Sequence, residues 1–253
     1  MKRVALYIVA LFASIAVSAT EQNSLVRWEA GNKAYIEGDY EKAIEEYRAI
    51  VEGGEYSGDL YYNMANAYFK SAKYGKAILY YNKALRLDPS SDDIRHNLAL
   101  AEAQTKDKIT AVPEFFLNGW LRTVRSLMSC TAWTVTSFVM LALAVMFALL
   151  FLLASGIKVR KSGFFGALCA ILLYVITTTF AVSSRNEMLR HDEAIVMGSA
   201  IAVKSSPDSS ATDLFVLHEG TKVHIVSEMD EWCEIVIADG KKGWTLKKSV
   251  ENI

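Results

Sequence analysis

The side chains best suited to metal binding or nucleophilic catalysis are scattered along this chain. The spacing of the histidines and cysteines matches neither a His-Glu-x-x-His nor a Cys-x-x-Cys motif, and no glycine-rich phosphate loop occurs. The sequence therefore predicts no catalytic residue, no metal site and no cofactor. The residues concerned are His96, His191, His218, His224, Cys130, Cys169 and Cys233.

One loop carries a pattern with metal-binding precedent. The run Asp208-Ser209-Ser210-Ala211-Thr212 resembles the Asp-x-Ser-x-Ser motif of von Willebrand A domains. That motif needs a strand, a loop and a helix in an α/β domain, whereas strand-like runs flank this loop on both sides. We therefore expect no metal there. Cys130 and Cys233 could both face an oxidising compartment, so a disulfide between them and free thiols both stay open.

The composition excludes some classes of protein. With 27 basic and 28 acidic side chains, the net charge is −1, which argues against a nucleic-acid binder that works through bulk charge. Hydrophobic residues make up 52%, more than a soluble domain needs, while 22% charged residues are too many for a bundle wholly in lipid. We therefore expect soluble domains together with membrane segments.

The apolar excess lies in three blocks. Residues 1–19 have a positive start, an apolar stretch and small residues at the end, which is typical of a secretory signal peptide; an uncleaved anchor is the alternative. Residues 132–157 and 164–182 lack charges and are long enough to span a bilayer as helices.

The short connection between those two segments predicts the topology. Residues 158–162 carry Lys158, Arg160 and Lys161, and positive charge in short loops marks the cytoplasmic side. Arginines also flank the outer ends, so the bias is moderate, but the signal peptide agrees with it. Both arguments place the regions before and after the membrane hairpin outside the cytoplasm.

An amphipathic segment precedes the first span, within residues 114–130. Phe116, Trp120 and Leu121 follow helical spacing, and polar residues fill the opposite face. We expect either a helix lying in the outer membrane interface or an extension of the spanning helix.

The region before the membrane repeats itself with a period of 34 residues. Residues 31–50 and 65–84 align, with small and aromatic residues at the same positions. This pattern resembles the tetratricopeptide repeat. We expect residues 20–108 to form two repeats, about 24–57 and 58–91, and a capping helix. The expected helices cover about 23–37, 40–53, 57–71, 74–87 and 91–106.

In tetratricopeptide arrays the first helix of each pair lines a concave groove. The resemblance implies that an asparagine at the position of Asn32 and Asn66 hydrogen-bonds an extended peptide, and aromatic neighbours would add apolar contact. The alternative is that these residues coat a solvated groove or pack on the membrane-proximal helix. The candidate groove residues are Trp28, Asn32, Tyr35, Tyr62, Asn63, Asn66, Phe69, Lys70, His96 and Asn97.

The region after the membrane, residues 192–253, predicts a small all-β barrel. Short strand-like runs alternate with turns, and Asp239-Gly240 is a hairpin signal. The order Leu217-His218-Glu219-Gly220-Thr221, Trp232 and Gly243-Trp244 resembles bacterial SH3 (SH3b) domains. Members of that family bind cell-wall peptides or proteins. Phe215, Trp232 and Trp244 could form such a surface, or they could belong to the barrel core.

The combined fold class is thus multidomain: a tetratricopeptide array, a two-helix transmembrane hairpin and an SH3-like barrel. This order resembles the BatE family of Bacteroides aerotolerance operons, as do residues 93–101 and 214–221. The resemblance implies a bacterial inner-membrane protein with both soluble domains in the periplasm. It also implies partners that are von Willebrand A-domain membrane proteins, with a MoxR-type AAA+ ATPase nearby.

Three functional classes follow. A non-enzymatic scaffold for protein partners is favoured, and a peptidoglycan-binding envelope sensor is the alternative. An enzyme or transporter is the weakest interpretation, because residues 132–157 and 164–182 contain no carboxylate, lysine, arginine or histidine.

Overall fold

The computed structural model describes residues 22–110, 112–113 and 115–253, and the chain forms two compact units. The first unit contains the helical repeats, the segment that follows them and the C-terminal sheet. The second unit contains the long apolar helices together with residues 85–91. The expected signal peptide, residues 1–19, lies outside the described residues. The expected fold class is confirmed: a helical repeat array, two apolar helices and an antiparallel sheet.

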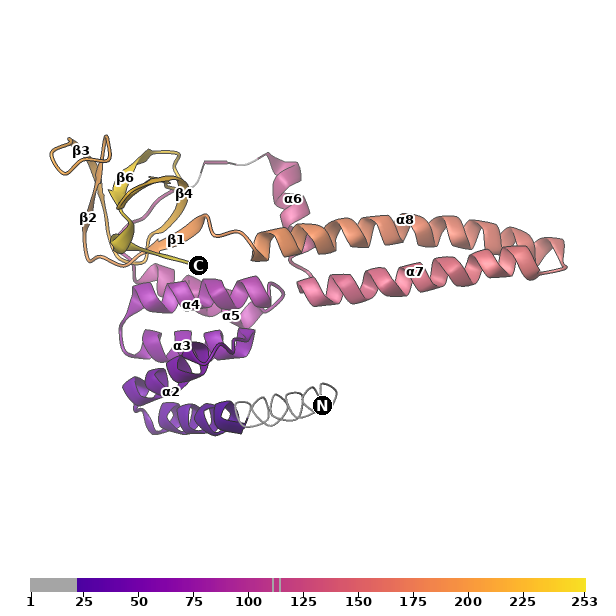
Figure 1. Ribbon diagram of the computed structural model, residues 1–253, viewed down its shortest axis with the longest axis horizontal. Helices are drawn as coiled ribbons and strands as arrows, with labels where there is room; N and C mark the ends of the chain where they lie inside the picture. Colours follow the sequence, from indigo (N-terminus) through magenta and orange to yellow (C-terminus); the bar gives the residue numbers. More distant parts are fainter. Residues whose placement is uncertain (1–21, 111, 114) are drawn as a thin grey trace, which may run out of the picture. The chain divides into compact units, whose positions relative to one another are not determined.

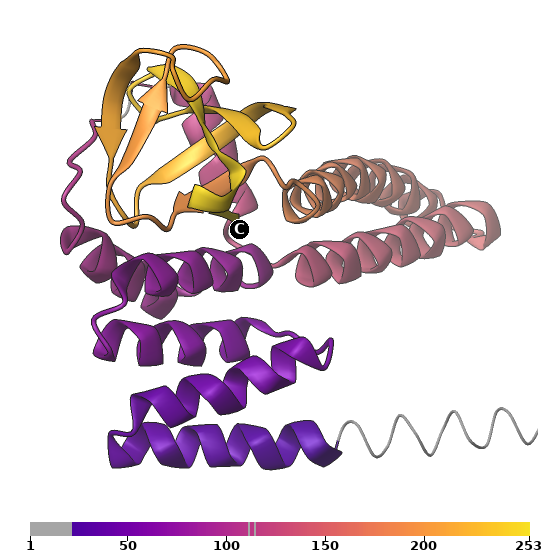
Figure 2. The same cartoon turned by 60° about the vertical axis from the view of Figure 1, so that its left-hand side comes forward.

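The array is built from antiparallel helices, stacked one on the next (Figures 1 and 2). Two helices begin at polar caps, since the side chains of Asp39 and Ser57 accept hydrogen bonds from the amides of Lys42 and Leu60. The helices cover residues 22–37, Tyr40–Glu52 (α2), Gly58–Lys70 (α3), Tyr74–Leu87 (α4) and Asp92–Ala103 (α5).

Small residues allow the paired helices to cross closely, as the repeat pattern predicts. Ala43, Ala65 and Ala77 are fully buried. A Cβ on Gly31 would stand 2.6 Å from the ring of Tyr47, so only glycine fits there. The tyrosine in turn fills the space between the helices and is itself buried.

The sheet domain consists of seven antiparallel strands in the order β3-β2-β6-β5-β4-β1-β7, curled around one core (Figure 2). Strands β5 and β6 form the hairpin that Asp239-Gly240 predicts, and Gly240 adopts a φ of +88° in the turn. The strands are Glu193–Val196 (β1), Ile201–Lys204 (β2), Asp213–Leu217 (β3), Lys222–Met229 (β4), Trp232–Val236 (β5), Lys242–Leu246 (β6) and Val250–Asn252 (β7).

Buried and more exposed side chains alternate along the strands, which gives the sheet a core face and an outer face. Cys233 and Ile235 of β5 point into the core together with Val203 of β2. A Cβ on Gly243 would stand 2.6 Å from Val203 Cγ1, so a glycine is required where β6 approaches β2. This explains the glycine of the Gly-Trp pair seen in the sequence.

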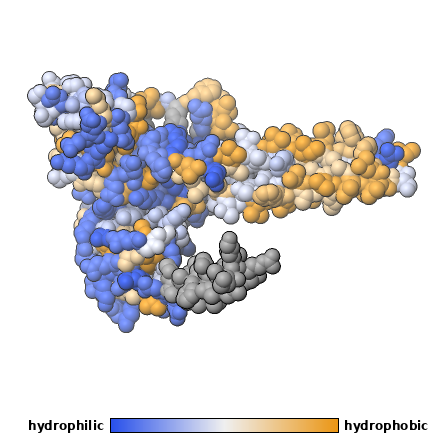
Figure 3. All heavy atoms as spheres, viewed as in Figure 1, coloured by the Kyte–Doolittle hydropathy of each residue, from blue (hydrophilic) through white to orange (hydrophobic). Residues whose placement is uncertain are grey.

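The second unit contains helices Phe116–Arg125 (α6), Cys130–Leu153 (α7) and Ile157–Met188 (α8). The last two are long and apolar enough to cross a membrane, and apolar side chains cover them on the outside (Figure 3). Exposed apolar side chains of this kind are typical of a helix in contact with lipid.

Helices α7 and α8 pack against each other through small residues with a seven-residue spacing. Gly163, Ala170, Thr177 and Ser184 of α8 are buried. A Cβ on Gly163 would meet the backbone of Phe151 at 2.6 Å, so the two helices touch there almost backbone to backbone. This spacing is that of a left-handed helical pair.

The connection between the two long helices differs from the expected loop at residues 158–162. The turn consists of residues 154–156, and Lys158, Arg160 and Lys161 already belong to the start of α8. Lysine and arginine are good helix formers, and no proline separates them from the apolar segment. Side chains at all three positions are exposed.

The segment before α7 is a separate short helix. Helix α6 ends at Arg125, and Ser129 starts α7 by accepting a hydrogen bond from the amide of Ala132 over 3.2 Å. Of the two expectations for this segment, an extension of the spanning helix is therefore excluded. Its exposed apolar side chains include Phe116, Leu117, Trp120 and Leu121.

Candidate partner-binding surfaces

The asparagine of the first repeat is anchored by two donors from within the array. The hydroxyl of Tyr47 donates to Oδ1 of Asn32 over 2.8 Å, and Nδ2 of Asn63 donates to the same oxygen over 3.2 Å. Burial raises the pKa of Tyr47 to about 12, so its hydroxyl keeps the proton that it donates. Asn32 thus links its own helix to both α2 and α3.

The second repeat reproduces this arrangement 34 residues further on. Asn66 Oδ1 accepts from the hydroxyl of Tyr81 over 2.6 Å and from Nδ2 of Asn97 over 3.0 Å. Asn97 Nδ2 also donates to the hydroxyl of Tyr62 over 3.0 Å. The same network in both copies shows that it belongs to the repeat pattern and not to one helix pair.

These bonds restrict what the two asparagines can offer a ligand. A carbonyl oxygen has two lone pairs, and the Oδ1 of Asn32 and that of Asn66 each receive two donors from the array. Their Nδ2 groups are therefore the atoms suited to a ligand, and they require acceptors such as peptide carbonyls. Asn63 and Asn97, which were also predicted as groove residues, donate to these oxygens.

Pairs of aromatic rings also recur with the repeat. Tyr35 contacts Tyr40 edge-on with ring centroids 5.5 Å apart, and Phe69 contacts Tyr74 in the same way at 5.7 Å. All four side chains are half-buried. Each repeat thus presents an aromatic ring whose orientation is held by a neighbour, which reduces the entropy lost on binding.

The remaining predicted groove residues differ in exposure. Lys70 and His96 are exposed, whereas Trp28 and Tyr62 are half-buried and pack against Tyr47 and Tyr81. Trp28 also lines a hollow of about 260 Å³ together with Leu25, Ile50, Tyr56 and Leu60. The lining residues come from several segments, so no local sequence pattern indicated this hollow.

One exposed apolar residue was missed by the sequence reasoning. Ile36 is 84% exposed and lies 34 residues before Lys70, so it occupies the position that Lys70 has in the second repeat. The 34-residue period would have identified Ile36, because it is the first-repeat equivalent of the predicted groove residue Lys70. The two copies therefore present different chemistry at this position, one apolar and one cationic.

Strand register places the three predicted SH3b surface residues on two faces. Trp232 pairs with Leu246, and Trp244 pairs with Glu234, so both tryptophans lie on the outer face and are half-buried. Phe215 pairs with the buried Val203 and packs against the core. The register therefore brings the two tryptophans together and separates Phe215 from them.

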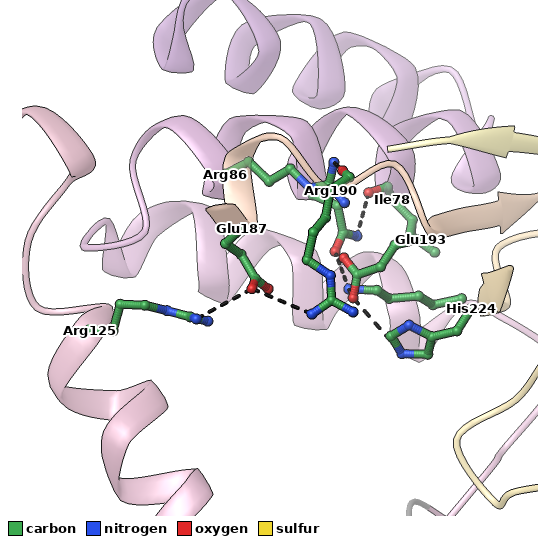
Figure 4. A network of polar contacts seen from close by, with 9 residues as sticks. Ile78, Arg86, Arg125, Glu187, Arg190, Glu193 and His224 are labelled. Carbon is green, nitrogen blue, oxygen red and sulfur yellow. Dashed lines mark hydrogen bonds and ion pairs between the residues drawn. The ribbon is translucent and has the colours of Figure 1, made fainter. Parts of the chain in front are cut away.

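Several other ionisable groups form local ion pairs. In the sheet domain, Glu193 accepts from Lys222 at 2.9 Å and lies 3.9 Å from His224 (Figure 4). In the second unit, Glu187 lies 3.3 Å from Arg125 and 3.9 Å from Arg190. Within the described residues no group of three histidine, cysteine or acidic side chains could hold a metal ion.

The three cysteines are free thiols in this structure. Cys233 is fully buried in the sheet core, and its thiol lies 3.6 Å from the carbonyl oxygen of Thr245. Burial raises the pKa of Cys233 to about 11, so the thiol is protonated at neutral pH and a poor nucleophile.

Comparisons with known proteins agree with this architecture. Residues 58–91 match the family described as "Tetratricopeptide repeat", and residues 199–251 match "Bacterial SH3 domain". The chain therefore contains both kinds of domain, which bind partners and are not themselves catalytic.

A relative is the "Protein SGT1 homolog" of Oryza sativa subsp. japonica, 31% identical over 102 residues. The match covers 38% of this chain, and the chain spans 28% of the relative's length.

Proposed function

We propose that this protein is a non-enzymatic inner-membrane scaffold that presents its tetratricopeptide groove and its SH3b domain to protein partners in the periplasm. The observation that carries the proposal is the repeated pair of side chains on the array. Each repeat offers an anchored asparagine with its Nδ2 available and an aromatic ring held edge-on.

This arrangement suits an extended peptide. Two amide donors spaced by one repeat match acceptors along a main chain, and the rings of Tyr35 and Phe69 supply apolar contact beside them. Because tyrosine hydroxyls and neighbouring asparagines already hold each Oδ1, the donors are preorganised before a ligand arrives.

The resemblance to BatE proteins supplies the finer part of the proposal. It supports a role in an aerotolerance or envelope-stress complex with von Willebrand A-domain membrane proteins, near a MoxR-type AAA+ ATPase. Two apolar helices supply the membrane anchor, and the exposed Lys158, Arg160 and Lys161 at the start of α8 support an orientation with that end in the cytoplasm. The exposed apolar side of α6 would lie in the outer membrane interface.

Co-purification in detergent tests the groove. We expect the von Willebrand A-domain partner to co-purify with the wild-type chain and to be reduced about tenfold or more by Asn66→Ala combined with Phe69→Ala, a loss of at least about 1.4 kcal/mol. Phe69→Tyr is the matched control, because it installs the ring type that Tyr35 provides in the first repeat. Unchanged recovery of the partner with the double variant would rule the groove out.

A second function is supported by the outer face of the SH3b sheet. Trp232 and Trp244 are half-buried on one face, as expected of a shallow site that stacks on a sugar or peptide. This favours an envelope sensor that binds peptidoglycan. Retention of the detergent-solubilised chain on purified cell-wall sacculi should then fall with Trp244→Ala, but not with the control Trp120→Ala in α6. Absence of retention at low salt would exclude the sensor.

A further inference from the structure

The turn between β3 and β4 lies directly against helix α4 of the repeat array, within the first compact unit. The amide of Gly75, in the first turn of α4, donates to Oε1 of Glu219 over 3.0 Å. Amides at a helix N-terminus lack partners within the helix and attract negative charge, so a carboxylate is well suited there. One helical turn along, a Cβ on Gly220 would stand 2.9 Å from Ile78 Cδ1.

The contact continues along the same face of the helix. Asn82 is buried in α4 and accepts from Lys222 Nζ over 3.4 Å. Positions 75, 78 and 82 form one stripe on a helix, and the turn follows this stripe in order from residue 219 to residue 222. Beside the stripe, Lys76 forms an ion pair with Glu251 of β7 at 2.5 Å.

Asp107, in the segment after α5, holds the same turn from a second direction. Its Oδ2 accepts from the amide of His218 and from the hydroxyl of Thr221, both over 2.7 Å. Its Oδ1 lies 2.7 Å from Nδ1 of His218. Two residues later, Ile109 packs against the core of the sheet domain. The segment after the repeats is thus part of the SH3b fold, although more than one hundred residues separate the two in sequence.

We propose that the stripe Gly75, Ile78 and Asn82 on α4 is a binding site whose ligand is the turn 218–222 of the chain's own SH3b domain. The SH3b domain then covers the last helix pair of the repeat array, as a capping repeat does in longer arrays. It also follows that this turn is not available to outside partners. The groove and the face with Trp232 and Trp244 are left for them.

Membrane crossing is compatible with this internal contact. Two spanning helices lie between Asp107 and His218, and a chain that crosses twice returns to the side that it left. The contact therefore requires no third span and no swapped partner chain.

Gly75→Ala tests the interface without harming the helix, since alanine is the better helix former. The added Cβ would overlap Cγ of Glu219, so this side chain must move and its hydrogen bond with the Gly75 amide is weakened. Hydrogen–deuterium exchange of the full chain in detergent reports this at the His218 amide, which donates to Asp107. We expect its exchange to become about tenfold faster or more. In a Glu219→Ala background the same substitution should add nothing, because the side chain that it displaces is gone.

Two controls separate the interface from general damage. Gly119→Ala places a methyl group where no atom lies within 4 Å, and it should leave exchange at His218 unchanged. Protection of the Gly240 amide, which donates to Ile237 within the β5–β6 hairpin, shows that the sheet is still folded. Asp107→Asn provides a second variant with little change of shape, and we expect it to speed exchange at His218 as well.

Unchanged exchange at His218 in both Gly75→Ala and Asp107→Asn would overturn the proposal. Protection that disappears when the chain is diluted to a monomer would overturn it as well, because the turn would then be bound by a second copy.

Discussion

At the scale of single residues, Asp107 makes three polar contacts with the turn 218–222 of the SH3b domain. Burial by itself would raise the pKa of Asp107, but the hydrogen bonds from the His218 amide, Thr221 and the His218 ring outweigh it. The pKa of Asp107 therefore lies below its usual range. A carboxylate stabilised in this way contributes to folding only while it is ionised.

This predicts a pH-dependent effect of Asp107→Asn. Near neutral pH the loss of charge-assisted hydrogen bonds should lower the free energy of unfolding by about 2 kcal/mol. Because the folded-state pKa is lowered, this contribution is present above the unfolded pKa of about 3.9 and is lost as the pH falls through the folded value. Thermal unfolding of both chains should thus show a gap in Tm at pH 7 that narrows at about pH 3.

Asp208→Asn is the comparison for that measurement, since its carboxylate also accepts hydrogen bonds from Ser210, but within its own exposed loop and away from the interface. A Tm gap for Asp107→Asn that is the same at both pH values would contradict the role assigned to its charge.

Single residues were predictable where the repeat defines them. Asn32, Asn66, Tyr35 and Phe69 follow from the 34-residue period. The role of Asp107 could not be predicted from the sequence, because its partners lie 111 and 114 positions away and no local pattern marks it.

At the scale of elements, the turns that end the first helix of each repeat differ in one informative way. Gly38 and Ala72 occupy equivalent positions, and both adopt positive φ values, +81° and +57°. Equivalent backbone hydrogen bonds close the two turns. The amide of Asp39 donates to the carbonyl oxygen of Ala34 in the first, and the amide of Lys73 donates to that of Tyr68 in the second. Glycine adopts this conformation without strain, whereas alanine adopts it at an energetic cost.

We therefore expect Ala72→Gly to stabilise the protein by up to about 1 kcal/mol, through relief of backbone strain. Gly38→Ala should destabilise it by a similar amount, since nothing within 4 Å of an added Cβ would compensate. Chemical denaturation followed by circular dichroism measures both changes. A loss of stability in Ala72→Gly would contradict the interpretation.

The paired apolar helices allow a matching test in the second unit. Gly163→Ala would place a methyl group 2.6 Å from the backbone nitrogen of Phe151 and 2.9 Å from the carbonyl oxygen of Phe147. Because backbone atoms cannot turn aside, the helices must separate, at a cost of about 1–3 kcal/mol. Unfolding of the chain in mixed detergent micelles measures this cost. Gly156→Ala, with its nearest contact at 3.8 Å, should change little, and equal effects of both variants would refute the close packing.

Elements with a clear period were predicted well. The expected helix at 40–53 is observed as Tyr40–Glu52, and the expected helix at 74–87 as Tyr74–Leu87. The ends of the long helices were harder to predict, because a run of charged residues in the sequence does not reveal whether the backbone turns there. Residues 158–162 continue as helix, so α8 begins earlier than its apolar stretch.

At the scale of the whole molecule, we expect the array and the SH3b domain to lie on one side of a membrane and the start of α8 on the other. In a background with the natural cysteines replaced by alanine, we expect Ser209→Cys to react with a membrane-impermeant maleimide in intact cells. Lys158→Cys should react only after lysis, because the proposed topology places it in the cytoplasm. The reverse labelling pattern would show that the topology is the opposite one. Labelling of both cysteines in intact cells would contradict the membrane hairpin.

The central claim is that the groove of the array holds a partner protein. A photo-crosslinking phenylalanine analogue in place of Phe69 tests it most directly in living cells, with the same analogue at the exposed Glu45 of α2 as the control. We expect a cross-link from position 69 to a von Willebrand A-domain membrane protein and none from position 45. No cross-link to that class of protein from position 69, or equal cross-linking from both positions, would contradict it.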